Sequence, residues 1–112
     1  MNIETLKVFK DLIDTQSFTK TARMNYISQS AVSQQIKKLE MIFKTKLFIK
    51  KYDKFELTRV GKILYEGSCE IINVYDGTIL KIRDRFDDNA RGEIKISSIY
   101  TIGIYLLNNY IR

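Results

Sequence analysis

The chain has 112 residues, of which 45% are hydrophobic, and 19 Lys and Arg residues against 13 Asp and Glu residues give it a net charge of +6 at pH 7. This composition allows one modest core and excludes wholesale disorder. With no histidine and a single cysteine, the chain lacks the ligands of a metal cluster and the base of a His-assisted nucleophile. We therefore predict no metal, no cofactor and no enzymatic activity.

The positive charge is concentrated in the first half of the chain. Residues 1–57 hold 11 basic and 6 acidic residues, whereas residues 58–112 hold 8 and 7. The first half would attract a polyanion, although moderately basic domains also occur without any nucleic-acid role. The chain opens without a basic, apolar signal, and no apolar run reaches the length of a membrane span. We therefore expect a cytoplasmic protein without a membrane partner.

Three helical segments open the chain. Residues 3–15 have apolar side chains at helical spacing, which predicts an amphipathic helix. Ser17 is a typical N-cap residue for a short second helix that ends near Met24. Residues 25–27 form a turn before the third segment. This succession of helix, short helix, three-residue turn and helix has the spacing of a helix-turn-helix, in which the last helix is the recognition helix.

The third segment, residues 28–43, has two distinct faces. Val32, Ile36, Leu39 and Phe43 repeat at spacings of four, three and four, so this face belongs in a core. The opposite face begins with amides and hydroxyls and continues with lysines. Such groups suit the hydrogen-bonding edges of bases in the DNA major groove. An ordinary amphipathic surface helix would show the same pattern, so this stretch alone leaves both interpretations open.

A hairpin is predicted next, at residues 47–57, where two short β-prone runs flank a polar turn. Beside a helix-turn-helix, such a hairpin is a wing. We expect Lys50, Lys51 and Lys54 near its tip to contact DNA phosphates or the minor groove, which positions the domain more than it reads sequence. A solvated, charged turn is the simpler alternative.

A long helix is predicted from residue 59 to about residue 86, after a capping Thr58. It carries an apolar stripe that a small winged domain cannot bury, so we expect a second copy of the chain to cover it. Gly67 and Gly77 each lower the stability of this helix by about 1 kcal/mol relative to alanine. A close crossing of two helices at these glycines is one explanation for their presence. The stripe consists of Leu64, Ile71, Tyr75, Ile79, Ile82 and Phe86.

The last residues predict a break and the start of another domain. Residues 87–92 are polar, residues 93–97 alternate as a strand, and residues 102–111 are compatible with the start of a helix. One strand and part of a helix do not form a domain. We therefore interpret residues 91–112 as the beginning of a domain that is cut short.

In this order, the motifs resemble the N-terminal part of LysR-type transcriptional regulators. The resemblance covers essentially the whole chain, and the ordered set of motifs is specific although no single motif is decisive. It rests on Leu6 and Phe9, Ser17-Phe18-Thr19, Ala22, the run from Ser28 to Ser33, Ile36, Leu39-Glu40, Leu47-Phe48, Leu57-Thr58, Gly61 and the run from Arg91 to Ile96.

The resemblance implies a mainly α fold, with a winged helix-turn-helix DNA-binding domain at residues 1–57 and a linker helix and hinge at residues 58–90. Residues 91–112 would be the truncated start of an effector-binding domain, so we expect no small-molecule effector to bind this fragment. The implied partners are double-stranded DNA and a second copy of the chain, which pairs through the linker helix. For a full-length form, the resemblance also allows a tetramer. The candidate DNA-binding residues are Ser28, Gln29, Ser30, Ser33, Gln34, Lys37, Lys38, Lys50, Lys51 and Lys54.

Three positions depart from the family pattern. Ser30 stands where proline is frequent, which leaves one more hydroxyl for DNA. Asn25 occupies a usually apolar position, so either the contact between the second and third helices is looser or Met24 is used instead. Asp53 stands where a wing arginine is common, which argues against direct minor-groove insertion and shifts the cationic role to the wing lysines.

Two functions from different classes are consistent with these observations. The first is a sequence-specific DNA-binding transcriptional regulator that binds an interrupted inverted repeat as a dimer. The second is an interaction module whose long helix pairs with a full-length relative and acts as a dominant-negative subunit. Mixed dimers on co-purification would support the second function.

Overall fold

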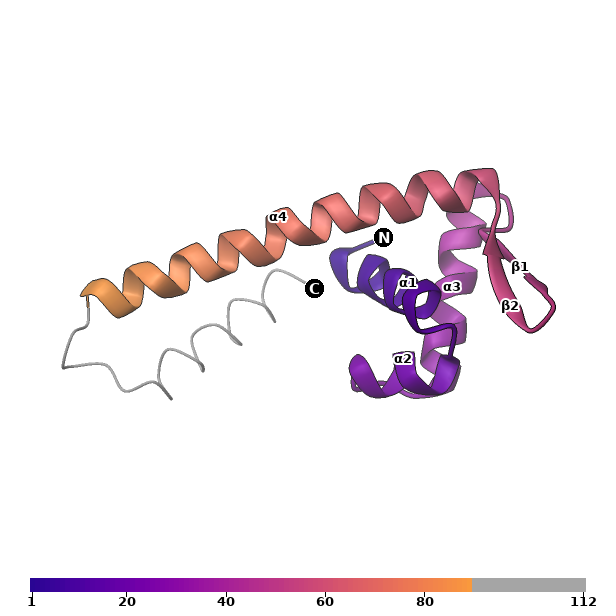
Figure 1. The fold of residues 1–112 in the computed structure, drawn as a ribbon, viewed down its shortest axis with the longest axis horizontal. Coiled ribbons are helices and arrows are strands. Elements are labelled where there is room, and N and C mark those ends of the chain that lie inside the picture. Colours follow the sequence, from indigo (N-terminus) through magenta and orange to yellow (C-terminus); the bar gives the residue numbers. More distant parts are fainter. Residues whose placement is uncertain (90–112) are drawn as a thin grey trace. The chain divides into compact units, whose positions relative to one another are not determined.

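The computed structural model describes residues 1–89, and it is mainly helical as predicted. The elements in chain order are α1 (Ile3–Thr15), α2 (Phe18–Met24), α3 (Gln29–Phe43), β1 (Phe48–Lys51), β2 (Lys54–Leu57) and α4 (Arg59–Asn89) (Figure 1). The chain divides into two compact units after Ile71. The first unit contains α1, α2, α3, the hairpin and the start of α4. The strand and helix start predicted within residues 91–112 lie outside the described residues.

The first three helices begin at capping residues that the sequence supplies. Asn2, Ser17 and Ser28 each accept a hydrogen bond from the backbone amide three residues later. Each bond satisfies an amide that the start of a helix leaves without a partner, and a cap of this kind typically stabilises a helix by about 1 kcal/mol. α1 and α3 are followed by the C-cap residues Gln16 and Lys44, whose left-handed backbones turn the chain away from the helix axis.

α1, α2 and α3 enclose one small core together with the residue that precedes β1. The buried residues are Val8, Phe9, Leu12, Ala22, Val32, Ile36, Leu39 and Leu47. Each fully buried Leu or Phe side chain contributes about 1.5–3 kcal/mol by leaving water. The predicted apolar face of α3 is thus buried, except that Phe43 is 37% exposed. The prediction of a buried Phe43 is wrong because this residue ends α3, one turn beyond the last core position.

The turn between α2 and α3 is held by polar contacts. Asn25 donates from Nδ2 to Asp11 Oδ2 at 2.9 Å and to the Thr21 carbonyl oxygen at 3.0 Å. Met24 is 54% exposed, so the hypothesis that it replaces an apolar side chain at this contact is wrong. Asn25 thus joins the end of α2 to α1 by a hydrogen bond.

β1 and β2 pair antiparallel, which confirms the hairpin predicted at residues 47–57. The ring of Phe55 lies edge-on to Phe18 with centroids 5.5 Å apart, and its centroid is 5.0 Å from that of Phe48. The Gln16 side chain accepts a hydrogen bond from the Phe55 amide at 2.6 Å and donates one to the Phe55 carbonyl oxygen at 3.2 Å. The strand β2 is therefore attached to the α1–α2 junction at Phe55.

α4 begins in close contact with the backbone before β1. The Thr58 amide donates to the Leu47 carbonyl oxygen at 3.0 Å, and the Thr58 hydroxyl oxygen accepts from the Gly61 amide at 3.1 Å, which confirms the predicted cap. A Cβ atom at Gly61 would lie 1.8 Å from the Leu47 carbonyl oxygen, so only glycine fits there. The helix ends at Asn89, not near residue 86, because aspartate and asparagine lower helix stability only modestly.

Tyr65 joins the first turns of α4 to α1. Its hydroxyl donates a short hydrogen bond to Asp14 Oδ1, and Lys10 Nζ lies 2.7 Å from Asp14 Oδ2. Burial raises the pKa of Asp14, but the hydrogen bonds from Lys10 and Tyr65 outweigh it and leave the pKa below its ordinary value. The hydrogen bond to Asp14 raises the pKa of Tyr65 and that of Lys10. The three side chains thus connect α1 to α4 within the first unit.

Candidate nucleic-acid interface

The face of α3 opposite the core carries amide, hydroxyl and ammonium groups. The candidate DNA-binding residues that are exposed within α3 are Gln29, Ser30, Gln34, Lys37 and Lys38. Ser33 is half-buried between this surface and the core. Because Val32, Ile36 and Leu39 fill the inner face, the outer face is free for a polar partner. Hydrogen-bonding amides followed by ammonium groups suit base edges and phosphates respectively.

Two of these residues are already hydrogen-bonded within the chain. Ser28 Oγ accepts from the Ala31 amide at 3.0 Å as the cap of α3, which leaves its hydroxyl hydrogen to donate elsewhere. Gln29 Nε2 donates to Thr19 Oγ1 on α2 at 2.9 Å. The Gln29 carboxamide is thereby oriented while its oxygen and second N–H group remain available. Sequence reasoning missed Thr19, because only the packing of α2 against α3 brings the two side chains together.

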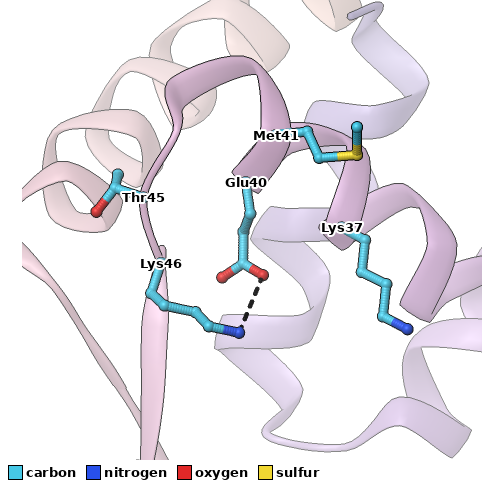
Figure 2. A pocket seen from close by; sticks show the side chains of 5 residues that line it. All are labelled: Lys37, Glu40, Met41, Thr45 and Lys46. Atoms are coloured by element: carbon cyan, nitrogen blue, oxygen red, sulfur yellow. Dashed lines mark ion pairs between the residues drawn. The ribbon is translucent and has the colours of Figure 1, made fainter.

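Glu40 connects the last turn of α3 to the start of the wing. Its Oε2 accepts a hydrogen bond from the Leu47 amide at 2.9 Å, and Lys46 Nζ lies 3.9 Å from its Oε1. Figure 2 shows this ion pair beside a surface hollow at the end of α3, with the Lys37 ammonium directed away from the carboxylate. Lys37 can therefore meet an external anion, whereas the charge of Lys46 is partly offset within the chain.

The wing presents its charge at the tip. Lys50, Lys51 and Lys54 are all exposed, as the sequence predicts for phosphate contacts. Lys51 and Lys54 face each other as a cross-strand pair, and like charges in that position repel each other. A polyanion near the tip would relieve this repulsion. The turn itself is Tyr52 and Asp53, and Tyr52 is a second residue that sequence reasoning did not single out.

The predicted dimerisation stripe is divided between two environments. Leu64 packs partly buried against the core of the first unit. Tyr75 and Ile79 are half-buried, whereas Ile71, Ile82 and Phe86 are exposed. Half of the predicted stripe therefore belongs to the exposed apolar surface of α4.

The free apolar face of α4 includes two residues that the prediction left out. Ile63 and Val74 are 66% and 71% exposed, and Ile71 between them is 50% exposed. Together with Gly67 these positions follow spacings of four, four and three, which place them on one side of a helix. A Cβ atom at Gly67 would meet nothing within 4 Å among the described residues. Glycine at the centre of the face concealed its periodicity in the sequence.

The described residues contain no group of three or more His, Cys, Asp or Glu side chains that could hold a metal ion. Among the helices of residues 1–89, none is long and apolar enough to cross a membrane.

A sequence profile described as "Bacterial regulatory helix-turn-helix protein, lysR family" matches residues 3–62. The chain belongs to the LysR family. It is 35% identical over 107 residues to the HTH-type transcriptional regulator CysL of Bacillus subtilis (strain 168), an alignment that covers 96% of this chain and 36% of CysL. The LysR-family chain described here therefore spans about a third of the length of the curated relatives it matches.

Solved structures of LysR-type regulators share its fold. The BenM DNA-binding domain in complex with catB site 1 DNA has a TM-score of 0.67 at 26% identity, covering 77% of this chain and 94% of that one. Vibrio fischeri DarR in complex with DNA has a TM-score of 0.65 at 26% identity, covering 75% of this chain and 29% of DarR. These findings confirm the winged helix-turn-helix with a long helix, and a family of DNA-binding transcriptional regulators rather than enzymes.

Proposed function

We propose that this LysR-family chain binds double-stranded DNA with sequence specificity through the outer face of α3 and the lysines of the wing. The burial pattern of α3 supports this proposal most directly, because its apolar side fills the core and leaves a polar side free. Gln29 and Gln34 suit bidentate pairing with adenine, and Lys37 suits guanine or phosphate. The wing lysines would add contacts to the DNA backbone. In this proposal, residues 1–57 form the DNA-binding domain.

The proposal includes a dimer through α4, within a linker region at residues 58–90. Its support is the exposed apolar face with Ile63, Ile71 and Val74, which a second α4 would cover. Two-fold symmetry would place the two α3 helices in major grooves about 34 Å apart, which corresponds to an interrupted inverted repeat. The dimer would act on DNA in the cytoplasm, as expected for a bacterial-type regulator.

The test is a gel-shift titration on a duplex that the wild-type chain has enriched from a random pool. Gln34→Ala should lower discrimination at one base pair of each half-site by about tenfold, because it removes one bidentate contact. Lys50→Ala should weaken binding to all sequences alike and reduce the salt slope by about 1. Lys46→Ala is a matched control with a smaller expected effect, because Lys46 is near Glu40. Equal losses on enriched and random DNA for Gln34→Ala and Lys50→Ala would contradict these roles.

A second function uses the same exposed face of α4. The chain would pair with a longer LysR-family relative and withdraw it from its sites as a mixed dimer. Co-expression of the chain with such a relative, followed by affinity purification of one partner, tests this function. Recovery of homodimers alone would reject it.

A further inference from the structure

The turn of the wing holds a tyrosine in a conformation that suits smaller residues. Lys51 pairs with Lys54 across the hairpin, so that Tyr52 and Asp53 alone form the turn. Their φ angles are 52° and 61°, and two-residue hairpin turns of this left-handed kind favour asparagine or aspartate followed by glycine. Aspartate tolerates the left-handed region, whereas a bulky side chain is strained there. The backbone of Tyr52 is therefore held at an energetic cost.

The fold does not use the ring of Tyr52. The side chain is 90% exposed. In the part of the chain that the structure describes, the contacts that attach the hairpin are made by Phe18, Phe48, Phe55 and Gln16 instead. A strained turn residue with an exposed aromatic side chain is typical of a binding site carried on a rigid support.

The surroundings of Tyr52 indicate the chemistry of its partner. Lys50, Lys51 and Lys54 are exposed around the turn, so an anionic polymer would be attracted to the tip. An aromatic ring with a hydroxyl fits the sugar–phosphate chain of such a polymer, because the ring packs on the sugar and the hydroxyl donates to phosphate. The carboxylate of Asp53 repels phosphate oxygens and opposes deep entry into a groove.

We propose that Tyr52 is a DNA-contacting residue at the edge of the minor groove beside the base pairs that α3 reads. Its hydroxyl donates to a phosphate oxygen, and its ring packs against a deoxyribose. This inference rests on the proposed DNA-binding function, and it assigns to the wing a contact that does not depend on lysine charge. Because minor-groove width varies with sequence, the contact makes affinity depend on the flanking base pairs.

The test compares Tyr52→Phe and Tyr52→Asn with Lys50→Ala on the enriched duplex. Tyr52→Phe should weaken binding by at least about tenfold, the effect of losing one hydrogen bond to a charged group. Tyr52→Asn also removes the ring and should weaken binding further. Neither change alters the net charge, so the salt slope should remain that of the wild type, whereas Lys50→Ala should lower the slope by about 1. The melting temperature of Tyr52→Asn should equal or exceed that of the wild type, because asparagine tolerates the left-handed backbone.

Two further measurements locate the contact. The chain contains no tryptophan, so Tyr52→Trp places a single tryptophan at the tip, and its emission should shift when the duplex is added. Hydroxyl-radical footprinting reports protection of deoxyribose, and Tyr52→Asn should lose protection only in the flank. Asp53→Asn is the matched control in the same turn and should bind more tightly, because it removes a repulsive charge.

The outcomes separate this inference from the function on which it rests. An unchanged affinity and footprint for Tyr52→Asn, with a wild-type chain that binds the duplex, overturns the inference. It is also overturned if Tyr52→Asn lowers the melting temperature and Tyr52→Phe binds as the wild type does, because the ring would then have a structural role. A wild-type chain that binds no duplex overturns the proposed function instead.

Discussion

α3 and α4 are both amphipathic, but they differ in which face the chain covers. α3 buries Val32, Ile36 and Leu39 in the chain's own core and leaves its amides and lysines in solvent. α4 contacts the rest of the first unit through its first turns and leaves Ile63 and Ile71 largely exposed. The amides and lysines of α3 are therefore available to a polar, anionic partner, whereas the exposed isoleucines of α4 are available to an apolar one.

This difference supports the proposal that the two helices bind different partners. A polar face with amides is already well hydrated and gains from a partner that offers matching hydrogen-bonding edges. An exposed apolar face gains mainly from leaving water, and a second apolar helix provides that. The proposed partners are DNA for α3 and a second copy of the chain for α4, in keeping with the LysR family to which the chain belongs.

The largest expected effect concerns the covered side of α4. Gly61→Ala should destabilise the fold by more than about 3 kcal/mol, because its Cβ overlaps the Leu47 carbonyl oxygen and backbone cannot move aside cheaply. Gly67→Ala is the matched control on the free side and should raise stability by about 1 kcal/mol in a dilute monomer. Thermal unfolding of both variants measures the difference. Similar melting temperatures for the two variants would remove the distinction between the two sides of α4.

The next effect concerns the free side of α4. Val74→Lys should weaken dimerisation by at least about 100-fold, because it places an unpaired charge in an apolar interface. Asn73→Lys adds the same charge at a neighbouring exposed position away from the Ile63–Val74 face and should leave the dimer nearly unchanged. Sedimentation equilibrium gives both dissociation constants. If both variants dimerise equally well, the apolar face is not the dimer contact.

The smallest expected effect concerns the hydrogen bond between Asp14 of α1 and Tyr65 of α4. Burial raises the pKa of Asp14, but hydrogen bonds from Lys10 and Tyr65 lower it below its ordinary value of 3.8. A depressed carboxyl pKa stabilises the fold above pH 3.8, and this contribution is lost as the pH falls through the folded-state value. Asp14→Asn should therefore lower the melting temperature slightly at pH 7, because an ion pair this exposed stabilises the fold by less than about 1 kcal/mol.

The gap between wild type and Asp14→Asn should close below pH 3.8. A gap that stays constant from pH 7 to pH 3 would show that the carboxylate charge makes no contribution. Tyr65→Phe serves as the control, because it removes one hydrogen bond to Asp14 while leaving the carboxyl in place.

Much of the fold could be predicted because its signals are local. The capping serines at 17 and 28, the two faces of α3 and the hairpin follow from residue types and spacings within a few positions. The positions of the helix ends were less predictable. Asn89 extends α4 beyond the expected residue 86, because no single residue there excludes the helical backbone.

The candidate DNA-binding residues were predicted as a set, but the hydrogen bonds and backbone conformations of the individual residues were not. The sequence places Gln29 on the outer face of α3, yet its hydrogen bond to Thr19 depends on the packing of α2. Tyr52 was overlooked because its left-handed backbone follows from the two-residue turn that the strand register imposes. Such contacts join residues on different elements, and spacing along the chain does not report them.

The sequence by itself determined the elements, the polar face of α3 and the lysines of the wing, because helix and strand periodicity depends only on neighbouring residues. Only the tertiary structure decided which side of α4 is covered. That choice rests on the approach of Gly61 to Leu47 and on the bond between Tyr65 and Asp14. These partners are 14 and 51 positions apart in the chain, so the free apolar face became visible only once they were brought together.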